Sequence, residues 1–440
     1  MSDYSTAEVR LQVVNIPDST GADREYHVDL NTGEMVEPLD DPKFGWREKK
    51  IKGLVLADAY KDGGDGKRAE RSVICSTWLQ YYADADGGRR ELHRFNACQQ
   101  RLCPLCSARR AKIAARRLAR VLARVRADHA GTQLIFLTLT IQNVPGAGLR
   151  AALDQLTGAW KKMIDRRPVK RAIRGWFRAI EITRNAAADT YHPHIHAILV
   201  VEDAYFVKSN GLYLTKDNWI DMWQQSLRVQ YRPSVNIKST YVKAGAGPKS
   251  GKAADAAQAA AVEAAKYATK DADYISPGLS KAKRAEIVKI YTEALAGKRL
   301  TGMGGWVKEA AAALKLEIEA DKDDLVHDDE GSGELTEESA ELLEEYGWHF
   351  GLMEHYLTAR KANPNYRGGS GGDSGRDGSD GGGDDGGVLL EMPERDGRDG
   401  SDGEGRDHGS GSVRGLREDR ALRDPVSGAY IAAAMAADSS

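Results

Sequence analysis

The apolar and polar positions between residues 129 and 316 predict strands that alternate with helices. Runs of β-branched and apolar residues of strand length lie at 133–142, 175–184, 193–202 and 233–239. Apolar residues at helical spacing lie at 148–164, 216–228, 253–271, 280–297 and 306–320. Only a short polar loop separates the second strand from the third, which indicates an antiparallel hairpin. We therefore expect an α+β fold in which helices flank an antiparallel sheet.

The pattern changes on both sides of this region and divides the chain into five parts. We expect an N-terminal extension with short strands at 1–66, a cysteine-rich module ending in a basic helix at 67–128, and the α+β domain at 129–316. An acidic helical segment at 317–365 and a Gly/Asp-rich tail at 366–440 follow. Between Gly368 and Gly411, 17 of 44 residues are Gly and nine are Asp. Such a segment buries too little apolar surface to offset its chain entropy, so we expect a disordered tail.

Composition favours a cytoplasmic protein. The 440 residues are 41% hydrophobic, but no run of about 18 apolar residues occurs, so we expect no membrane-spanning helix. The polar start MSDYSTAEVR lacks the apolar core of a secretory signal. The four cysteines are too few for a disulfide scaffold, and their clustering in a chain without an export signal favours a metal site.

The net charge of −2 hides a strong asymmetry along the chain. Residues 101–126 hold nine Lys or Arg and no acid, and residues 161–178 hold eight basic residues and one acid. Residues 317–345 hold fourteen acids and one Lys. The basic runs favour a nucleic-acid partner. The acidic segment is either a solubilising helix pair or a DNA mimic that lies on the basic half.

The cysteines follow the spacing Cys75-x22-Cys98-x4-Cys103-x2-Cys106. A C-x2-C hook with an upstream pair can complete a four-thiolate zinc site, although the long first spacing leaves His93 open as a substitute for Cys75. The hook leads into a basic amphipathic helix at 107–126. We expect a structural zinc to brace this helix, and we expect the helix to contact DNA through Arg109, Arg110, Lys112, Arg116 and Arg117.

Three histidines alternate along the predicted strand at 193–202. His192, His194 and His196 share one face of the strand because side chains alternate between faces. If the hairpin turns near residues 187–188, Glu181 lies roughly opposite His194 on the same face. Imidazoles and a carboxylate gathered in this way favour a divalent cation, either Mn²⁺ or Mg²⁺.

The Ala-rich stretch at 253–271 carries a second group of polar residues. Glu263 and Tyr267 are four residues apart, and Lys270 follows on the same side of the predicted helix. A phenol with a pKa near 10 needs a nearby cation to act as a nucleophile at neutral pH, and a carboxylate one turn away can act as a general base. Taken alone, the group is also typical of an ordinary solvated helix face.

Three motifs in order resemble those of plasmid rolling-circle replication initiators (Rep proteins) of the HUH endonuclease superfamily. They are FLTLTIQN at 136–143, YHPHIHAILVV at 191–201 and EAAKYATKDADY at 263–274. The resemblance also takes in CPLC at 103–106 and KRLTGMGGW, and it covers roughly residues 70–310. It implies an HUH endonuclease core and site-specific, strand-specific nicking of plasmid origin DNA. The implied partners are a host helicase, a polymerase and a single-strand binding protein.

The resemblance also implies roles for individual residues. His194 and His196 correspond to the paired metal histidines, and Glu181 or His192 is a further candidate ligand. Tyr267 corresponds to the tyrosine that attacks the phosphodiester and forms a 5′-phosphotyrosyl link, which frees a 3′-OH primer. Glu263 corresponds to the base that activates water in the terminating cleavage, and Lys270 to the lysine of the third motif.

Two other functions remain open on the sequence alone. An HUH transposase or relaxase would share the chemistry, although a relaxase usually carries its histidine motif after its tyrosine. A non-catalytic, zinc-dependent DNA-binding regulator would account for the cysteines and arginines, but it leaves the histidine strand and the Glu263/Tyr267 helix unexplained.

Overall fold

The predicted antiparallel sheet is present and has five strands. The computed structural model describes residues 11–17, 23–29, 35–39, 44–85, 88–239, 271–318 and 335–367. The sheet consists of β6 (Thr132–Thr140), β7 (Gly175–Asn185), β8 (Thr190–Glu202), β9 (Val235–Ser239) and β10 (Thr301–Gly305). Their order is β10-β7-β8-β6-β9, and every neighbouring pair is antiparallel. The central hairpin β7–β8 is the one expected from the sequence.

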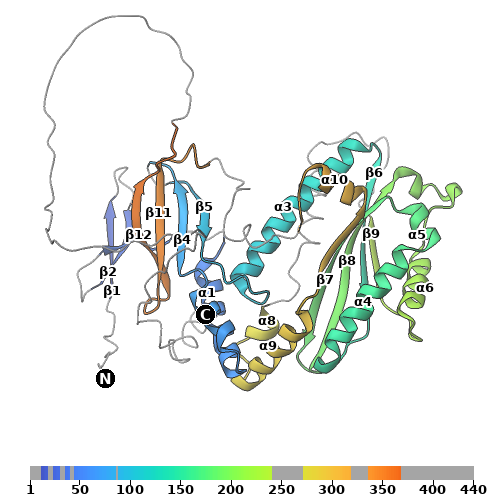
Figure 1. Ribbon diagram of the computed structural model, residues 1–440, viewed down its shortest axis with the longest axis horizontal. Coiled ribbons are helices and arrows are strands. Elements are labelled where there is room, and N and C mark those ends of the chain that lie inside the picture. The colour runs from blue at the N-terminus through green and yellow to red at the C-terminus, as the bar shows by residue number, and fades with distance from the viewer. Residues whose placement is uncertain are drawn as a thin grey trace, which may run out of the picture. The chain divides into compact units, whose positions relative to one another are not determined.

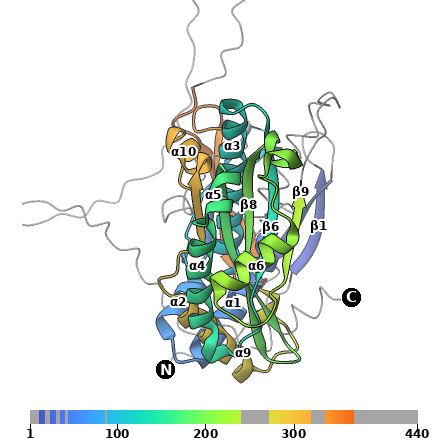
Figure 2. The same ribbon diagram turned by 90° about the vertical axis from the view of Figure 1, so that its right-hand side faces the viewer.

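Helices cover both faces of this sheet, as Figures 1 and 2 show. One face carries α3 (Pro104–Asp128) and α10 (Trp306–Ala313), and the other carries α4 (Leu149–Ile164) and α6 (Lys216–Leu227). Alternate residues of β8 serve the two faces: Ile198 and Val200 pack in the cluster with α3 and α10, whereas Ile195 and Leu199 belong to the larger core. The remaining helices near this sheet are α5 (Arg167–Ala172), α8 (Ala272–Ile275) and α9 (Lys281–Leu295).

A second sheet joins segments that are far apart in the sequence. It consists of β4 (Trp78–Ala83), β5 (Arg90–Phe95), β11 (Leu342–His349) and β12 (Glu354–Ala362), in the order β12-β11-β4-β5. Two helices precede it, α1 (Trp46–Asp62) and α2 (Gly66–Ile74). A further three-stranded sheet contains β1 (Leu11–Pro17), β2 (Asp23–Asp29) and β3 (Met35–Val36). The α+β class with antiparallel sheets is therefore confirmed.

Local sequence signals account for where several helices begin. Pro104 occupies the first turn of α3, where its missing N–H costs no hydrogen bond. Asp65 caps α2 by accepting the amide N–H of Arg68, and Ser280 caps α9 in the same way. Thr215 and Asn218 form a reciprocal capping box at the start of α6. The starts of α3, α6 and α9 lie close to those expected from the sequence, whereas α2 was not predicted.

The expected acidic helices at 317–365 are wrong for the part of this segment that the structure describes. Residues 342–362 form the hairpin β11–β12, and β11 pairs with β4. Alternate positions of β11 point inward, among them Tyr346 and the fully buried Glu344. Glu344 accepts hydrogen bonds from Arg90 at 2.6 Å, Arg360 at 2.7 Å and the Tyr346 hydroxyl at 2.9 Å. The two arginines compensate the negative charge of Glu344, and this pairing allows the carboxylate to be buried within the sheet.

The N-terminal region also contains more than the short strands expected at 1–66. Helix α1 has 17 residues and buries side chains on all sides, including Lys50. A helix without a continuous polar face lacks the amphipathic pattern that marks most helices in a sequence. Residues 253–270 of the predicted helix and residues 368–440 of the Gly/Asp-rich tail lie outside the described residues.

Candidate metal centres and DNA-contact helix

The hairpin β7–β8 brings together two of the three predicted histidines and the predicted glutamate. Glu181 on β7 pairs with His194 on β8, as the assumed turn near residues 187–188 requires. His196 lies one position further along the same face of β8. The ligand atoms of Glu181, His194 and His196 all lie within 4.8 Å of one another.

Hydrogen bonds on the far side of each imidazole orient Nε2 toward the carboxylate. Nδ1 of His194 lies 3.1 Å from the carbonyl oxygen of His192, and Nδ1 of His196 lies 3.4 Å from the hydroxyl of Thr138. The carbonyl can only accept, so Nδ1 of His194 carries a proton, and Nε2 is free to bind a cation once it gives up the proton that it shares with Glu181. Such a partner on the remote nitrogen is the usual support of a metal-binding histidine.

The spacing of these atoms fits a divalent cation. Oε2 of Glu181 lies 3.0 Å from Nε2 of His196 and 3.5 Å from Nε2 of His194. Neighbouring ligands of an octahedral ion with bonds of about 2.1 Å are separated by about 3.0 Å. Burial opposes ionisation of Glu181, but hydrogen bonds with His194 and His196 outweigh it and hold the pKa of this carboxyl well below its usual range. A charged carboxylate facing two imidazole nitrogens is a suitable donor set for Mn²⁺ or Mg²⁺.

His192 does not join this group. Its ring centroid lies 5.4 Å from that of His194, and burial together with the neighbouring His194 lowers its pKa. Its backbone carbonyl nevertheless accepts the hydrogen bond that orients His194. Of the two candidates for a further ligand, the geometry therefore favours Glu181. Thr138, which lies beside His196, was not identified from the sequence because a threonine in a strand carries no signal of its own.

The predicted nucleophile Tyr267, the predicted base Glu263 and Lys270 lie outside the described residues. The next described residues begin at Asp271, and this segment contacts the hairpin. Asp273 accepts the backbone N–H of Arg184 at 3.1 Å, on the same strand as Glu181. The hydroxyl of Tyr274 is buried and donates to the carbonyl of Leu102 at 2.7 Å, so this tyrosine has a structural contact.

The four cysteines form a second cluster with metal-site geometry. Cys75 follows α2, Cys98 follows β5, and Cys103 and Cys106 lie at the start of α3. All four are buried and unbridged, and Sγ of Cys75 lies 3.7 Å from Sγ of Cys103 and of Cys106. A regular tetrahedron with Zn–S bonds of about 2.3 Å has S–S separations of about 3.8 Å. The cluster therefore fits zinc, with Cys75 as the fourth sulfur in place of His93, whose ring contacts Tyr82.

The packed sulfurs influence one another's ionisation. Hydrogen bonds from its neighbours hold the pKa of Cys103 well below the ordinary value, whereas the contact with Cys103 raises the pKa of Cys75 and of Cys106. Four adjacent thiols therefore resist ionising together. A bound cation would relieve this repulsion, and Cys103 at the N-terminus of α3 also lies at the positive end of the helix dipole.

The basic residues of α3 divide into buried and exposed positions. Ile113, Leu118 and Val121 are buried and form the apolar side of the helix. Arg109 and Arg117 are buried as well, at 2% and 8% exposure, and Arg117 donates to the carbonyl of Glu317 at 2.9 Å. Arg110 donates to the carbonyls of Gln99 and Gln100, and Arg116 is half-buried. Of the five predicted DNA contacts, Lys112 alone is exposed, and Arg120 and Arg124 share that exposure.

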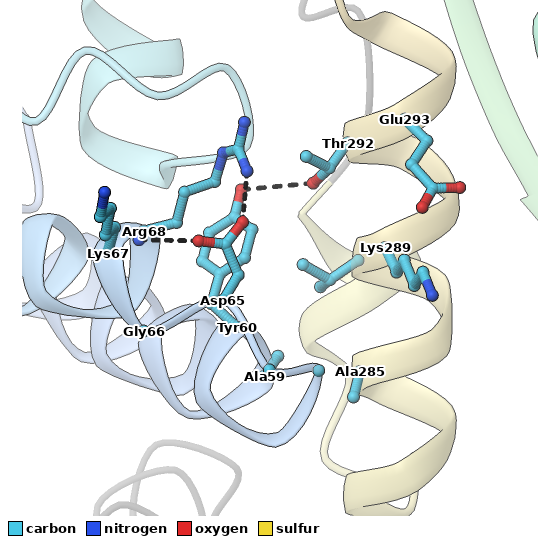
Figure 3. Close-up of a pocket in the computed structure, with 13 residues that line it drawn as sticks. Ala59, Tyr60, Asp65, Gly66, Lys67, Arg68, Ala285, Lys289, Thr292 and Glu293 are labelled. Carbon is cyan, nitrogen blue, oxygen red and sulfur yellow. Dashed lines mark hydrogen bonds and ion pairs between the residues drawn. The ribbon is translucent and has the colours of Figure 1, made fainter.

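A cavity of about 460 Å³ lies between the α1–α2 turn and α9 (Figure 3). Its polar groups already contact one another: Asp65 pairs with Arg68, and the hydroxyls of Tyr60 and Thr292 are 3.5 Å apart. Lys67, Lys289 and Glu293 complete its charged lining. The cavity contains none of the residues of the two metal-type clusters, and its polar groups form no recognisable catalytic arrangement.

Comparison with known proteins identifies the family. A model of the family described as replication protein matches residues 89–356, more than half of the chain. The chain belongs to the replication-protein (Rep) family. A Rep protein of Bacillus amyloliquefaciens is 32% identical over 72% of this chain and 94% of its own length. A Rep protein of Lactiplantibacillus plantarum is 34% identical over 71% of this chain and 95% of its own length. A Rep protein of Streptococcus pneumoniae is 32% identical over 68% of this chain and 89% of its own length.

This membership confirms the family resemblance that the motifs indicated. The match extends to residue 356 and so includes most of the β11–β12 hairpin, whereas the motif resemblance ended near residue 310. The family match therefore includes part of the acidic segment, which the motif resemblance did not cover. No solved structure matches the chain significantly. Among the described residues, no helix has both the length and the apolar character needed to cross a membrane.

Proposed function

We propose that this Rep protein initiates plasmid rolling-circle replication by nicking one strand of the origin DNA. The observation that carries the proposal is the convergence of Glu181, His194 and His196 on one face of the β7–β8 hairpin. Both imidazoles present Nε2 to a charged carboxylate, and both have a partner on Nδ1. A merely structural histidine pair would not need this arrangement.

The nicking step needs a nucleophile beside this group, and we assign that role to Tyr267. Its phenolate oxygen attacks the scissile phosphorus, a new P–O bond forms, and the bond to the 3′ oxygen breaks. The 3′ oxygen takes up a proton and becomes the primer hydroxyl, while the 5′ phosphate remains on the tyrosine. Glu181, His194 and His196 would hold Mn²⁺ or Mg²⁺, which supplies charge stabilisation at the phosphate. Lys270 adds a positive charge near the phenolate.

Termination requires a second cleavage of the DNA strand at the same active site. Glu263, one helical turn from Tyr267 in the predicted helix, accepts a proton from a water molecule that attacks the second scissile phosphorus. The 3′ hydroxyl that this cleavage frees on the displaced strand then attacks the 5′-phosphotyrosyl phosphorus, which closes the displaced circle and releases the hydroxyl of Tyr267. The two strand transfers each exchange one phosphodiester for another, and the hydrolysis is downhill, so no step consumes ATP.

Chain length supports placing Tyr267 at this site. Asp273 is held by the backbone of Arg184, which is three residues, or about 10 Å, along the strand from Glu181. Tyr267 precedes Asp273 by six residues, which span about 9 Å as a helix and about 20 Å when extended. The length of this segment therefore allows the tyrosine to reach the candidate metal ligands.

The origin duplex would be held by the exposed side of α3. Lys112, Arg120 and Arg124 are exposed on this helix, and its buried side packs on the sheet. We propose that zinc bound to the four cysteines fixes the start of α3 and hence the orientation of these cations. Contacts of this kind go to phosphates and position the protein without reading sequence.

The test is incubation of the full-length protein with its supercoiled parent plasmid and Mn²⁺ or Mg²⁺. We expect a nicked circle with protein attached covalently to a 5′ end. Tyr267→Phe should abolish both products, whereas Tyr213→Phe, which alters a tyrosine exposed elsewhere, should retain them. Full nicking by Tyr267→Phe would overturn the assignment of the nucleophile. DNA binding without nicking under either metal would favour the non-catalytic regulator.

A further inference from the structure

Lys50 is a fully buried lysine that lies against the four-cysteine cluster. It belongs to α1, and its side chain has no solvent exposure. Its ammonium donates hydrogen bonds of 2.5 Å to the carbonyl oxygens of Val73 and Cys75. The second carbonyl belongs to one of the four cysteines, so the lysine contacts the backbone of a candidate ligand directly.

The surroundings of this ammonium contain no carboxylate partner within the described part of the chain. Its charged neighbours there are the sulfurs of Cys75, Cys98 and Cys103. The rings of Trp348 and Phe350, from the β11–β12 hairpin and its turn, lie 5.8 Å away. Burying an ammonium without an anion is costly, so the compensating negative charge must come from the thiolates.

We propose that Lys50 is the counter-cation of a tetrathiolate metal site formed by the four cysteines. The inference rests on the zinc site proposed above and goes beyond it by assigning a residue from outside the cysteine motif. Four thiolates around a divalent cation carry a net charge of −2, and Lys50 reduces the buried charge to −1. Lys50 is a positioning residue, because it acts on the site through charge and through the Cys75 carbonyl.

A simpler role for Lys50 is that it caps α2. Val73 and Cys75 lie at the C-terminal end of that helix, where carbonyl oxygens lack intrahelical partners and a cation is favourable. A helix cap would stabilise the fold equally with and without metal. A counter-cation would raise the affinity for metal, so metal binding separates the two roles.

The experiment compares metal binding by the full-length wild type, Lys50→Met and Lys50→Gln. Met keeps the length of the side chain but removes the charge, and Gln retains a donor for the carbonyls without the charge. Lys61→Met, at an exposed position of the same helix, is the matched control. Zinc affinity is measured by competition with a chromophoric chelator. Cobalt substitution reports the number of thiolate ligands through the charge-transfer bands.

We expect both Lys50 variants to bind one zinc with about 10- to 100-fold lower affinity, in the range found for residues that support metal ligands. Lys61→Met should match the wild type. If Lys50→Met fails to fold, the comparison of Lys50→Gln with Lys50→Arg remains, and the charged variant should bind metal more tightly.

Three results would overturn the inference. Wild-type affinity in Lys50→Gln would show that the charge is not needed. Equal destabilisation of the metal-free and metal-bound forms, with unchanged affinity, would leave Lys50 as a helix cap. If the wild type shows no thiolate-bound cobalt or zinc, the metal site itself fails. Failure of the metal site can be told apart from failure of the role of Lys50, because it is seen in the wild type alone.

Discussion

Glu181 and His194 face each other across the β7–β8 pair, and the carboxylate oxygen Oε2 lies 3.5 Å from Nε2 of the imidazole. Because the strand register fixes this relationship, the site is built into the sheet and does not depend on a loop. The same register places His196 beside the same oxygen, at 3.0 Å. The candidate metal ligands are therefore positioned by the central hairpin that carries them.

Replacing Glu181 with Gln should remove the charge that this site offers to a cation. We expect Mn²⁺ affinity to fall by at least about 10-fold, and nicking to fall with it, because a neutral amide is a weaker ligand than a carboxylate. Isothermal titration with Mn²⁺ and the plasmid nicking assay measure the two effects. Glu202→Gln, at the exposed end of β8 where Glu202 pairs with Arg174, is the control and should behave as wild type. Unchanged Mn²⁺ binding by Glu181→Gln would exclude this carboxylate as a ligand.

Removing exposed cations from α3 should weaken DNA binding without changing which sequence is preferred. In Lys112→Ala/Arg120→Ala, two phosphate contacts disappear, so the slope of log affinity against log salt should decrease by about 2. Fluorescence anisotropy with origin and unrelated duplexes, over a range of salt concentrations, measures this slope. Lys216→Ala on α6 should leave it unchanged. A variant with the wild-type slope would indicate that DNA lies elsewhere.

The part of the fold that the sequence predicted well is the part with simple periodicity. Strands β6 to β9 lie close to their expected ranges because they are apolar, β-branched runs of strand length, and helices α4, α6 and α9 because their apolar residues recur at helical spacing. The relationship between Glu181 and His194 followed from counting residues through a short hairpin. The local hydrophobic pattern and the position of one turn were therefore sufficient to predict that Glu181 faces His194.

The parts that could not be predicted depend on contacts between distant segments. Glu344 looks like one more acid in an acidic run, and only the pairing with Arg90 and Arg360 explains why it is buried in a strand. Lys50 likewise looks like one of four lysines in a helix, although it lies against cysteines 25 or more residues away. Sequence spacing carries no signal for charges that are compensated across such distances.

The β11–β12 hairpin should be required for the stability of the cysteine module. A protein ending at Ile318 lacks it, so β4 loses its partner β11 and the Ser76 carbonyl loses the hydrogen bond from His355. We expect Tm to fall by at least about 5 °C, since buried Tyr346 and Trp348 are removed from the core. Differential scanning calorimetry, with zinc content measured in parallel, tests this. A protein ending at Arg367 keeps the hairpin and serves as the control; equal Tm values for the two proteins would contradict the prediction.

His355 should make the stability of this module depend on pH. The side chain has no solvent exposure, its Nε2 lies 2.7 Å from the Ser76 carbonyl oxygen, and its buried Nδ1 has no hydrogen-bond partner within the described residues. Burial lowers the pKa of His355 to about 4, below its ordinary value near 6.5. The unfolded chain therefore binds a proton more readily than the folded one between these two values. Folding stability contributed by the neutral ring is complete above pH 6.5 and is lost as the pH falls toward 4.

The expected loss is about 3 kcal/mol, from a pKa difference of about 2.5 units. The measurement is the free energy of unfolding by urea between pH 4 and 7 for wild type and His355→Gln, both saturated with zinc. Because acid weakens thiolate–metal bonds in both proteins, that effect cancels in the difference between their pH profiles. The wild type should lose more stability than the variant below pH 6.5, and the two profiles should run parallel above it. Parallel profiles over the whole range would mean that His355 titrates normally, and hence that this end of β12 admits water.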